Sequence, residues 1–174
     1  MSKNSIHYQT DIYVLDPEAE YQDIYRESDR SVGREINFLA TDEIPICKVL
    51  LPINPNHVDD IFTGIKKFEY RKTRCRKEIH GIIIYATSPV SRIVGEVEVT
   101  QIIEGTPEDV WNRTSYAAGI SNDFFGEYYR GRKKAVAYAL GQHMKYQKTL
   151  ELKDIGVKHA PQSYIYLRGR GFKE

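Results

Sequence analysis

Cysteine is scarce in this sequence, and its two cysteines, Cys47 and Cys75, stand apart with no CxxC pair. A disulfide framework and a zinc site built on closely spaced cysteines are therefore excluded. Long apolar runs are also missing, since the longest, residues 82–86, is far shorter than the ~18 apolar residues that span a bilayer. The first five residues lead into polar sequence, so we expect no export. These absences predict a protein of the reducing cytoplasm with no membrane partner.

Histidine is sparse as well. The five histidines stand at positions 7, 57, 80, 143 and 159, and no pair has the HxxxH spacing of a helical metal site. Neither cysteine lies in a recognisable nucleophile motif. We therefore predict that the protein uses no metal and no cofactor.

The chain does have enough residues for one folded domain, and its charge is unevenly distributed. Its 174 residues are 41% hydrophobic and 28% charged, as in typical globular domains. The net charge is +1, but residues 1–45 carry four basic and ten acidic side chains, whereas residues 46–174 carry 21 basic and 14 acidic. The balances are −6 and +7, so an acidic segment precedes a basic body. A basic body favours a nucleic-acid or nucleotide partner, with an evenly solvated surface as the alternative.

Short apolar or alternating segments separated by turn residues predict an α+β fold with a strongly curved mixed sheet or barrel. Helix starts are marked by a capping residue followed by proline, as at Asn54 and Thr106. Strands are expected at residues 47–53, 67–71, 79–86, 92–99, 135–140 and 163–167, and short helical segments at 54–63, from 106, from 121 and at 150–155. Residues 1–45 show a strand-like stretch at 6–15 and a helix start at Asp16, and form an acidic N-terminal extension of unknown role.

Gly64, Lys66, Glu69 and Arg71 form a Gly-x-Lys-x-x-Glu-x-Arg turn and strand that follows a predicted strand and short helix. This order resembles the opening of ASCH domains, which belong to the PUA-like superfamily together with EVE and YTH modules. The resemblance covers about residues 46–167 and predicts one domain over 46–174 with a short basic C-terminal tail. It implies a mixed β pseudo-barrel with short inserted helices, and a cleft that binds RNA, DNA or a single nucleotide.

The same turn is a candidate ligand-binding site on chemical grounds. Glu69 and Arg71 alternate with Phe68 and Tyr70, so they share one face of a strand. Arg71 can grip a phosphate or carboxylate through two parallel hydrogen bonds. Lys66 beside Glu69 can hold a carbonyl, or move a proton if burial shifts the pKa of either group. The alternative is an exposed surface ion pair that contributes ~0–1 kcal/mol.

The end of the predicted central strand supplies further candidates. In PUA-like folds this strand end faces the cleft, so the resemblance implies ligand contacts by Thr87, Ser88 and Arg92. Hydroxyl groups there would read a base edge or coordinate a phosphate. The alternative is a serine–proline turn that satisfies its own backbone.

Two dense clusters of basic residues are candidates for contact with a nucleic-acid backbone. Residues 66–77 hold seven basic side chains and one acid, and a second cluster follows Tyr128 and Tyr129. Binding of phosphates by such clusters weakens with salt, and tyrosines beside them suit stacking of unpaired bases. The predicted backbone contacts are Lys67, Lys72, Arg74, Arg76, Lys77, Arg130, Arg132 and Lys133.

These features favour binding of RNA, single-stranded nucleic acid or a modified nucleoside through a basic cleft. Basic charge is plentiful, whereas catalytic constellations are incomplete, so the sequence argues more for a binding module than for an enzyme. A regulatory interaction protein is one alternative, although residues 1–45 contain no helix-turn-helix pattern.

Hydrolysis is the other alternative, with Lys66 and Glu69 as the catalytic candidates. Some small bacterial ASCH proteins are similar to amidohydrolases that deacylate acetylcytidine with a Lys, a Thr and a Glu, and others are described as ribonucleases. Lys66 matches the family's Lys, but Glu69 stands where the Thr would be, and no residue matches the catalytic Glu. This departure weakens the amidohydrolase reading.

Overall fold

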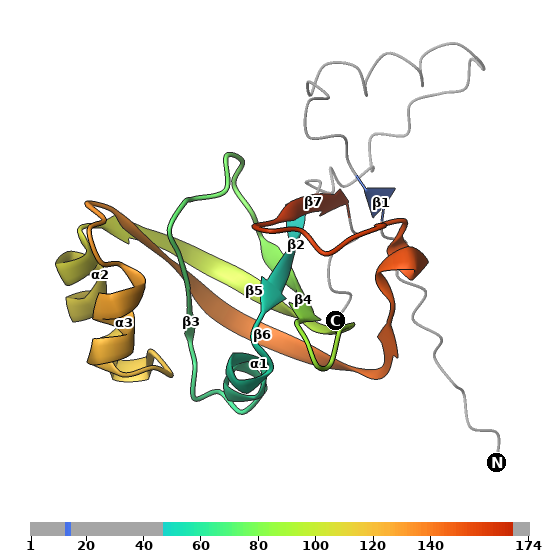
Figure 1. The fold of residues 1–174 in the computed structure, drawn as a ribbon, viewed down its shortest axis with the longest axis horizontal. Coiled ribbons are helices and arrows are strands. Elements are labelled where there is room, and N and C mark those ends of the chain that lie inside the picture. The colour runs from blue at the N-terminus through green and yellow to red at the C-terminus, as the bar shows by residue number, and fades with distance from the viewer. Residues whose placement is uncertain (1–12, 15–46, 169–174) are drawn as a thin grey trace, which may run out of the picture.

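The computed structural model describes residues 13–14 and 47–168 (Figure 1). The strands are β1 (Tyr13–Val14), β2 (Cys47–Ile53), β3 (Phe68–Arg71), β4 (Gly81–Ala86), β5 (Arg92–Gly105), β6 (Ala135–Leu150) and β7 (Ile165–Arg168). The helices are α1 (Pro55–Phe62), α2 (Pro107–Thr114) and α3 (Asn122–Tyr128), with short 3₁₀ turns η1 (Ser115–Ala117) and η2 (Leu152–Ile155). The predicted α+β class is therefore confirmed.

The strands form one mixed sheet in the order β1-β7-β2-β4-β5-β6-β3. β2 and β4 run parallel, and every other neighbouring pair is antiparallel. β5 and β6 form a long antiparallel pair, connected through α2, η1 and α3, and β3 pairs with the first part of β6. The sheet is not closed, because β1 and β3 are its two edges. The predicted mixed sheet with short inserted helices is present as an open sheet.

The β5–β6 pair extends well beyond the strands predicted from the apolar pattern. β5 continues to Gly105 instead of ending near 99, and β6 continues to Leu150 instead of 140. The second half of β6 is mostly exposed and polar, with Tyr146 and Leu150 partly buried against an apolar cluster, so backbone pairing with β5 contributes much of its strand conformation. The strand and helix predicted within residues 6–45 lie outside the described residues, apart from β1.

The capping signals in the sequence do begin the helices. The side chains of Asn54 and Ser121 accept hydrogen bonds from backbone N–H groups of the first turns of α1 and α3. Thr106 and Asp109 form a reciprocal capping box at α2. Gly64 follows α1 with φ +77, the left-handed conformation that lets the chain turn sharply into β3.

Three apolar clusters hold the domain together. The central one buries Ile82 and Ile84 of β4, while Ile83 and Tyr85 face a separate cluster with η2 and β7 on the other side of the sheet. The remaining cluster joins α2 and α3 to β3 and the first part of β6, at the left of Figure 1. None of the helices in the described part of the chain is long and apolar enough to cross a membrane.

Candidate functional site

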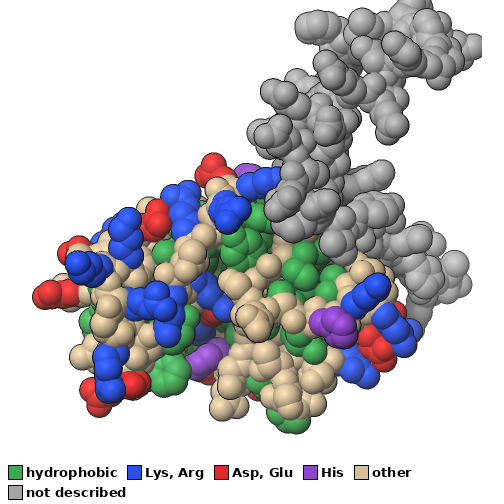
Figure 2. All heavy atoms as spheres, turned by 45° about the horizontal axis from the view of Figure 1, so that its top comes forward, with side chains coloured by type: hydrophobic (Ala, Val, Ile, Leu, Met, Phe, Trp, Pro, Cys, Tyr) green, Lys and Arg blue, Asp and Glu red, His purple; other side chains and the backbone are tan. Residues whose placement is uncertain are grey.

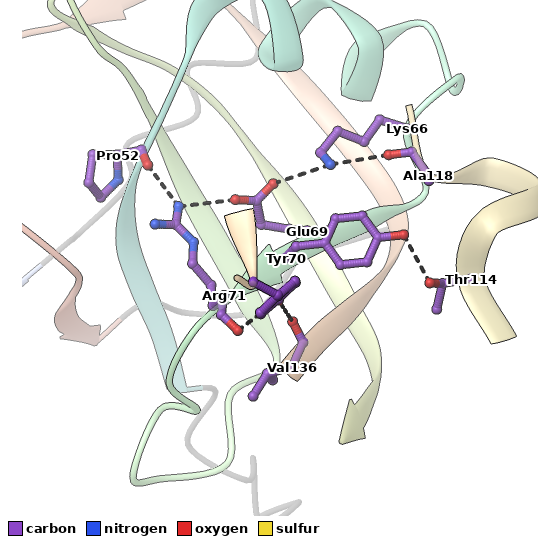
Figure 3. A network of polar contacts seen from close by, with 9 residues as sticks. Pro52, Lys66, Glu69, Tyr70, Arg71, Thr114, Ala118 and Val136 are labelled. Atoms are coloured by element: carbon purple, nitrogen blue, oxygen red, sulfur yellow. Dashed lines mark hydrogen bonds and ion pairs between the residues drawn. The ribbon is translucent and has the colours of Figure 1, made fainter. Parts of the chain in front are cut away.

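Lys66, Glu69 and Arg71 form a continuous network of charged side chains (Figure 3). Glu69 lies between the two cations, with its carboxylate oxygens 3.1 Å from Arg71 Nη2 and 3.8 Å from Lys66 Nζ. β3 places Glu69 and Arg71 two residues apart on one face, as the sequence predicts. The turn after α1 brings Lys66 to the same carboxylate, so the structure joins the three residues of the predicted motif.

The network is largely removed from water. Lys66 and Glu69 are buried, and Lys66 Nζ donates a hydrogen bond to the Ala118 carbonyl at 3.2 Å. Burial lowers the pKa of Lys66 below its usual 10.5, against the opposing charges of Glu69 and Asp60. The alternative of a purely exposed ion pair on β3 is therefore excluded for this network.

Arg71 also connects β3, at one edge of the sheet, to the C-terminal part of β2. Its Nη2 donates to the Pro52 carbonyl at 2.7 Å. The next carbonyl along β2, that of Ile53, accepts from Thr87 N on the β4 side. Because neighbouring carbonyls along a strand point in opposite directions, the Pro52 carbonyl faces away from β4. On that side, β7 pairs with residues 47–50 of β2 and does not reach Pro52. A side chain thus spans the gap between β2 and β3, where the sheet has no backbone ladder.

Two tyrosines position the strand that carries the network. Tyr129 is buried, and its hydroxyl lies 2.9 Å from the Arg71 carbonyl and 3.1 Å from the Val136 carbonyl. The Tyr70 hydroxyl donates to Thr114 Oγ1 at 2.9 Å. Burial raises the pKa of Tyr70 to about 12 and that of Tyr129 still further, so both remain protonated donors.

His57, which the sequence argument did not select, lies beside this network. Burial and the nearby charge of Lys66 lower the pKa of the His57 imidazole below its usual 6.5. Its Nδ1 is buried without a hydrogen-bond partner among the described residues, as is Nε of Arg71. The only sequence feature that could have indicated His57 is its position in the first turn of α1, the helix that leads into the Gly64 turn.

The structure also brings parts of the two basic clusters together around Tyr128. Lys72 lies over the Tyr128 ring, with Nζ 4.7 Å from its centroid. The charges of Arg71 and Arg132 both act on the Tyr128 hydroxyl, although burial is the larger effect and raises its pKa. Residues about sixty positions apart in the sequence therefore meet next to the network.

The other predicted backbone contacts are more dispersed. Arg74 and Arg130 are exposed but form ion pairs with Glu104 and Glu127. The loop with Arg76 and Lys77 packs toward β7, where the hydroxyl oxygens of two tyrosines accept backbone hydrogen bonds from it. Lys67 and Lys133 are exposed. Figure 2 shows Lys and Arg side chains over the left and upper part of one face of the domain, with acidic side chains between and beside them.

Arg92 has a different environment from the network. Its Nη2 pairs with Glu151 at 3.3 Å, and both residues line an open cavity of about 420 Å³ together with Tyr85, Lys153 and other residues near η2. None of the three network residues lines this cavity. The structure therefore does not join Arg92 to the predicted site.

Thr87 and Ser88 follow directly after β4. Thr87 is half-buried, and its backbone N–H donates a hydrogen bond to the Ile53 carbonyl. Ser88 is exposed and precedes a cis proline. Their roles as ligand contacts stay predictions. Among residues 47–168, no three His, Cys, Asp or Glu side chains lie together as a metal site.

Comparisons with known proteins place this geometry in a family. The sequence model of the ASCH domain matches residues 51–151. An "ASCH domain-containing ribonuclease" from Zymomonas mobilis is 28% identical over 125 residues, which cover 70% of this chain and 84% of that protein. Two Ureaplasma parvum proteins also match: "ATP synthase subunit alpha" is 26% identical over 91% of this chain, and "Large ribosomal subunit protein uL22" is 25% identical over 69%. The chain spans only 20% and 39% of their respective lengths.

Solved structures give the same result. The crystal structure of ASCH from Zymomonas mobilis has a TM-score of 0.62 at 27% identity, covering 67% of this chain and 85% of that one. A serine-to-alanine variant of the Zymomonas protein gives a TM-score of 0.63 at 27% identity, covering 70% and 89%. Because the family match extends over more than half of the sequence, this chain belongs to the ASCH domain family.

Proposed function

We propose that this domain binds RNA through the surface around Arg71, the least buried member of the Lys66–Glu69–Arg71 network, and the basic residues around Tyr128. The observation that carries the proposal is that Lys72 lies over the Tyr128 ring and that Arg71 and Arg132 are near enough for their charges to act on the Tyr128 hydroxyl, which concentrates positive charge around this residue. Concentrated positive charge attracts a phosphate backbone. The resemblance to a Zymomonas ribonuclease supports RNA as the nucleic acid.

The network suits recognition more than general attraction. Arg71 is the most exposed of its three members, and its guanidinium presents several N–H donors in one plane. Glu69 keeps that guanidinium in place, so Arg71 needs little reordering to meet a phosphate or a base edge. The surrounding lysines supply attraction, and the network supplies a fixed contact.

Salt-dependent binding of short RNA tests the proposal. We expect the double variant Lys72→Ala/Arg132→Ala to bind single-stranded RNA more weakly than wild type, with a slope of log K against log salt that is shallower by about 1.4, because each lost phosphate contact removes about 0.7. Fluorescence anisotropy at several salt concentrations measures both quantities. A modified nucleoside, the alternative ligand, enters the same assay as a competitor.

Lys153→Ala/Lys158→Ala is the matched control. It also removes two positive charges, but from the cavity near η2, and leaves the proposed surface intact. We expect its affinity and slope to stay close to wild type. Equal losses in the two double variants would mean that only net charge matters, and wild type that fails to bind RNA at low salt would overturn the proposal.

RNA cleavage is a second candidate, favoured by the lowered pKa of Lys66 next to the Glu69 carboxylate. A lysine that releases its proton more readily than usual is a candidate general acid or base. The test is gel analysis of end-labelled RNA incubated with wild type, Lys66→Met and Lys67→Met. Lys67 is the exposed neighbour of Lys66 and so controls for charge.

Loss of product with Lys66→Met but not with Lys67→Met is the expected result if the domain cleaves RNA. Retention of full cleavage by a folded Lys66→Met variant would remove Lys66 from the mechanism. A parallel assay with N4-acetylcytidine tests the amidohydrolase alternative.

A further inference from the structure

Large apolar side chains are exposed at a few positions of the described residues, and three of them are linked to the network through their immediate neighbours. Ile65, Tyr116 and Phe124 are 59%, 78% and 52% exposed. Ile65 directly precedes Lys66, and the other two come from η1 and α3, which lie on the same side of β3. Exposed apolar groups gathered around a buried polar site indicate a binding surface more than a packing defect.

Tyr116 is held in place by contacts close to Lys66. Its ring meets the buried Phe68 ring edge-to-face at a centroid distance of 5.5 Å. The next residue accepts a hydrogen bond from Lys67 N at 2.9 Å, and the carbonyl of Ala118 accepts the one from Lys66 Nζ. Tyr116 is therefore a positioned ring whose surface remains largely open to solvent.

Phe124 lies on the α1 side of the network. α3 buries the neighbouring Phe125 against Tyr70 and Tyr129, which leaves the Phe124 ring to point outward. Phe124 contacts His57 edge-to-face with ring centroids 5.9 Å apart. His57 in turn is close enough to Lys66 and Glu69 for their charges to act on its imidazole.

The two rings thus lie at the margin of a site rich in hydrogen-bonding groups. Folding alone does not account for an exposed aromatic ring, because burial of its apolar area would stabilise the domain. Flat aromatic rings beside cations are the usual stacking surfaces for unpaired bases, which carry a flat face and a negatively charged backbone. Paired bases in a duplex present no free face for such stacking.

We propose that Tyr116 and Phe124 are the stacking surfaces for unpaired bases of the bound RNA. This inference rests on the proposed RNA-binding function and adds which part of the RNA contacts which rings. The phosphates meet Lys72 and Arg132, while the bases lie on the aromatic rings next to the network.

Short single-stranded RNAs that carry 2-aminopurine test the inference, because stacking quenches the fluorescence of this base. We expect wild type to quench it, and Phe124→Ala and Tyr116→Ala each to lose quenching and bind roughly tenfold more weakly. Phe124→Tyr and Tyr116→Phe keep a ring and are expected to restore both properties. Met144→Ala, an exposed apolar residue on β6, controls for loss of surface apolar area.

Several outcomes separate this inference from the proposed function. Wild type that binds RNA tightly while both alanine variants bind and quench equally well overturns the stacking role but not RNA binding. Wild type that binds duplex RNA as tightly as single strands also overturns it. The free 2-aminopurine riboside is the last arm: quenching lost in the alanine variants, without any RNA binding, would support the rings as a base site and overturn RNA as the ligand. No quenching of either probe overturns the stacking role, and only the absence of RNA binding in the anisotropy assay overturns the proposed function.

Discussion

Glu69 and Glu151 both lie between two cations, but in opposite surroundings. Glu69 joins Lys66 and Arg71 in a network whose carboxylate side chain is 8% exposed, whereas Glu151 joins Arg92 and Lys153 with 41% exposed. The shortest contact belongs to the exposed cluster, where Lys153 Nζ is 2.7 Å from Glu151. Contact distance alone therefore does not predict which cluster contributes more to stability, because water and salt screen the charges of the exposed one.

The surroundings of the two clusters differ as well. Parts of both basic clusters and the half-buried His57 lie near Glu69, and the exposed Phe124 ring contacts His57, whereas an open cavity with lysines lies beside Glu151. Removing one partner of a buried ion pair costs much stability, because the remaining charge is left buried without a countercharge. Burial therefore holds the groups in a fixed arrangement. A fixed arrangement is what a recognition site needs, and we therefore assign recognition to the Glu69 side.

The largest expected difference comes from removing each carboxylate. Glu69→Gln leaves the buried Lys66 and the partly buried Arg71 without the carboxylate that they share, so we expect a loss of about 3–5 kcal/mol in the free energy of unfolding. Glu151→Gln removes a screened surface partner and should change stability little. Urea denaturation of both variants measures the effect. Two midpoints indistinguishable from wild type would show that burial does not separate the clusters.

A smaller difference is expected between two glycines with positive φ. Gly119 has φ +65, and a Cβ there would lie 2.6 Å from Lys66 Cβ, whereas Gly131 has φ +72 and would meet nothing within 4 Å. Gly131→Ala should cost roughly 1–2 kcal/mol for the left-handed backbone alone. Gly119→Ala should cost more in thermal or urea unfolding and should also weaken RNA binding, because it displaces Lys66. Equal losses from the two variants would contradict the tight packing of Lys66 against residue 119.

The smallest expected effect is the pH dependence contributed by His57. Its pKa is lowered in the folded state, so the unfolded chain takes up a proton first as the pH falls below its usual 6.5. The stability that neutral His57 contributes is present above pH 6.5 and is lost as the pH falls. Urea unfolding at pH 7.5, 6.5 and 5.5 should therefore show wild type losing more stability than His57→Gln. A constant difference between the two proteins across this range would contradict the shift.

Local signals in the sequence were enough for the elements that carry the network. Asn54, Thr106 and Ser121 cap helices because capping depends on neighbouring residues. Glu69 and Arg71 share a face because alternation along a strand is fixed by the backbone. The fold class followed from these same short-range patterns.

Long-range contacts were beyond such patterns. β3 pairs with β6, more than sixty residues later, and this pairing brings Tyr128 and Arg132 to Arg71. Arg92 was predicted in the same site, but its ion pair with Glu151 depends on where the chain returns after β6. The mostly exposed second part of β6 has only Met144, Tyr146 and Leu150 as apolar residues on one face, too sparse a pattern to predict a strand without its pairing to β5. The domain boundary at residue 45 and the role of the acidic extension stay predictions.

Photochemical cross-linking tests most directly whether the Glu69 side of the domain is the recognition surface. Single-stranded RNA containing 4-thiouridine would be irradiated with the full chain, and the cross-linked peptides identified by mass spectrometry. We predict cross-links within residues 115–133, which carry Tyr116, Phe124, Tyr128 and Arg132. Cross-links confined to residues 85–92 and 151–158, around Glu151, would contradict the account.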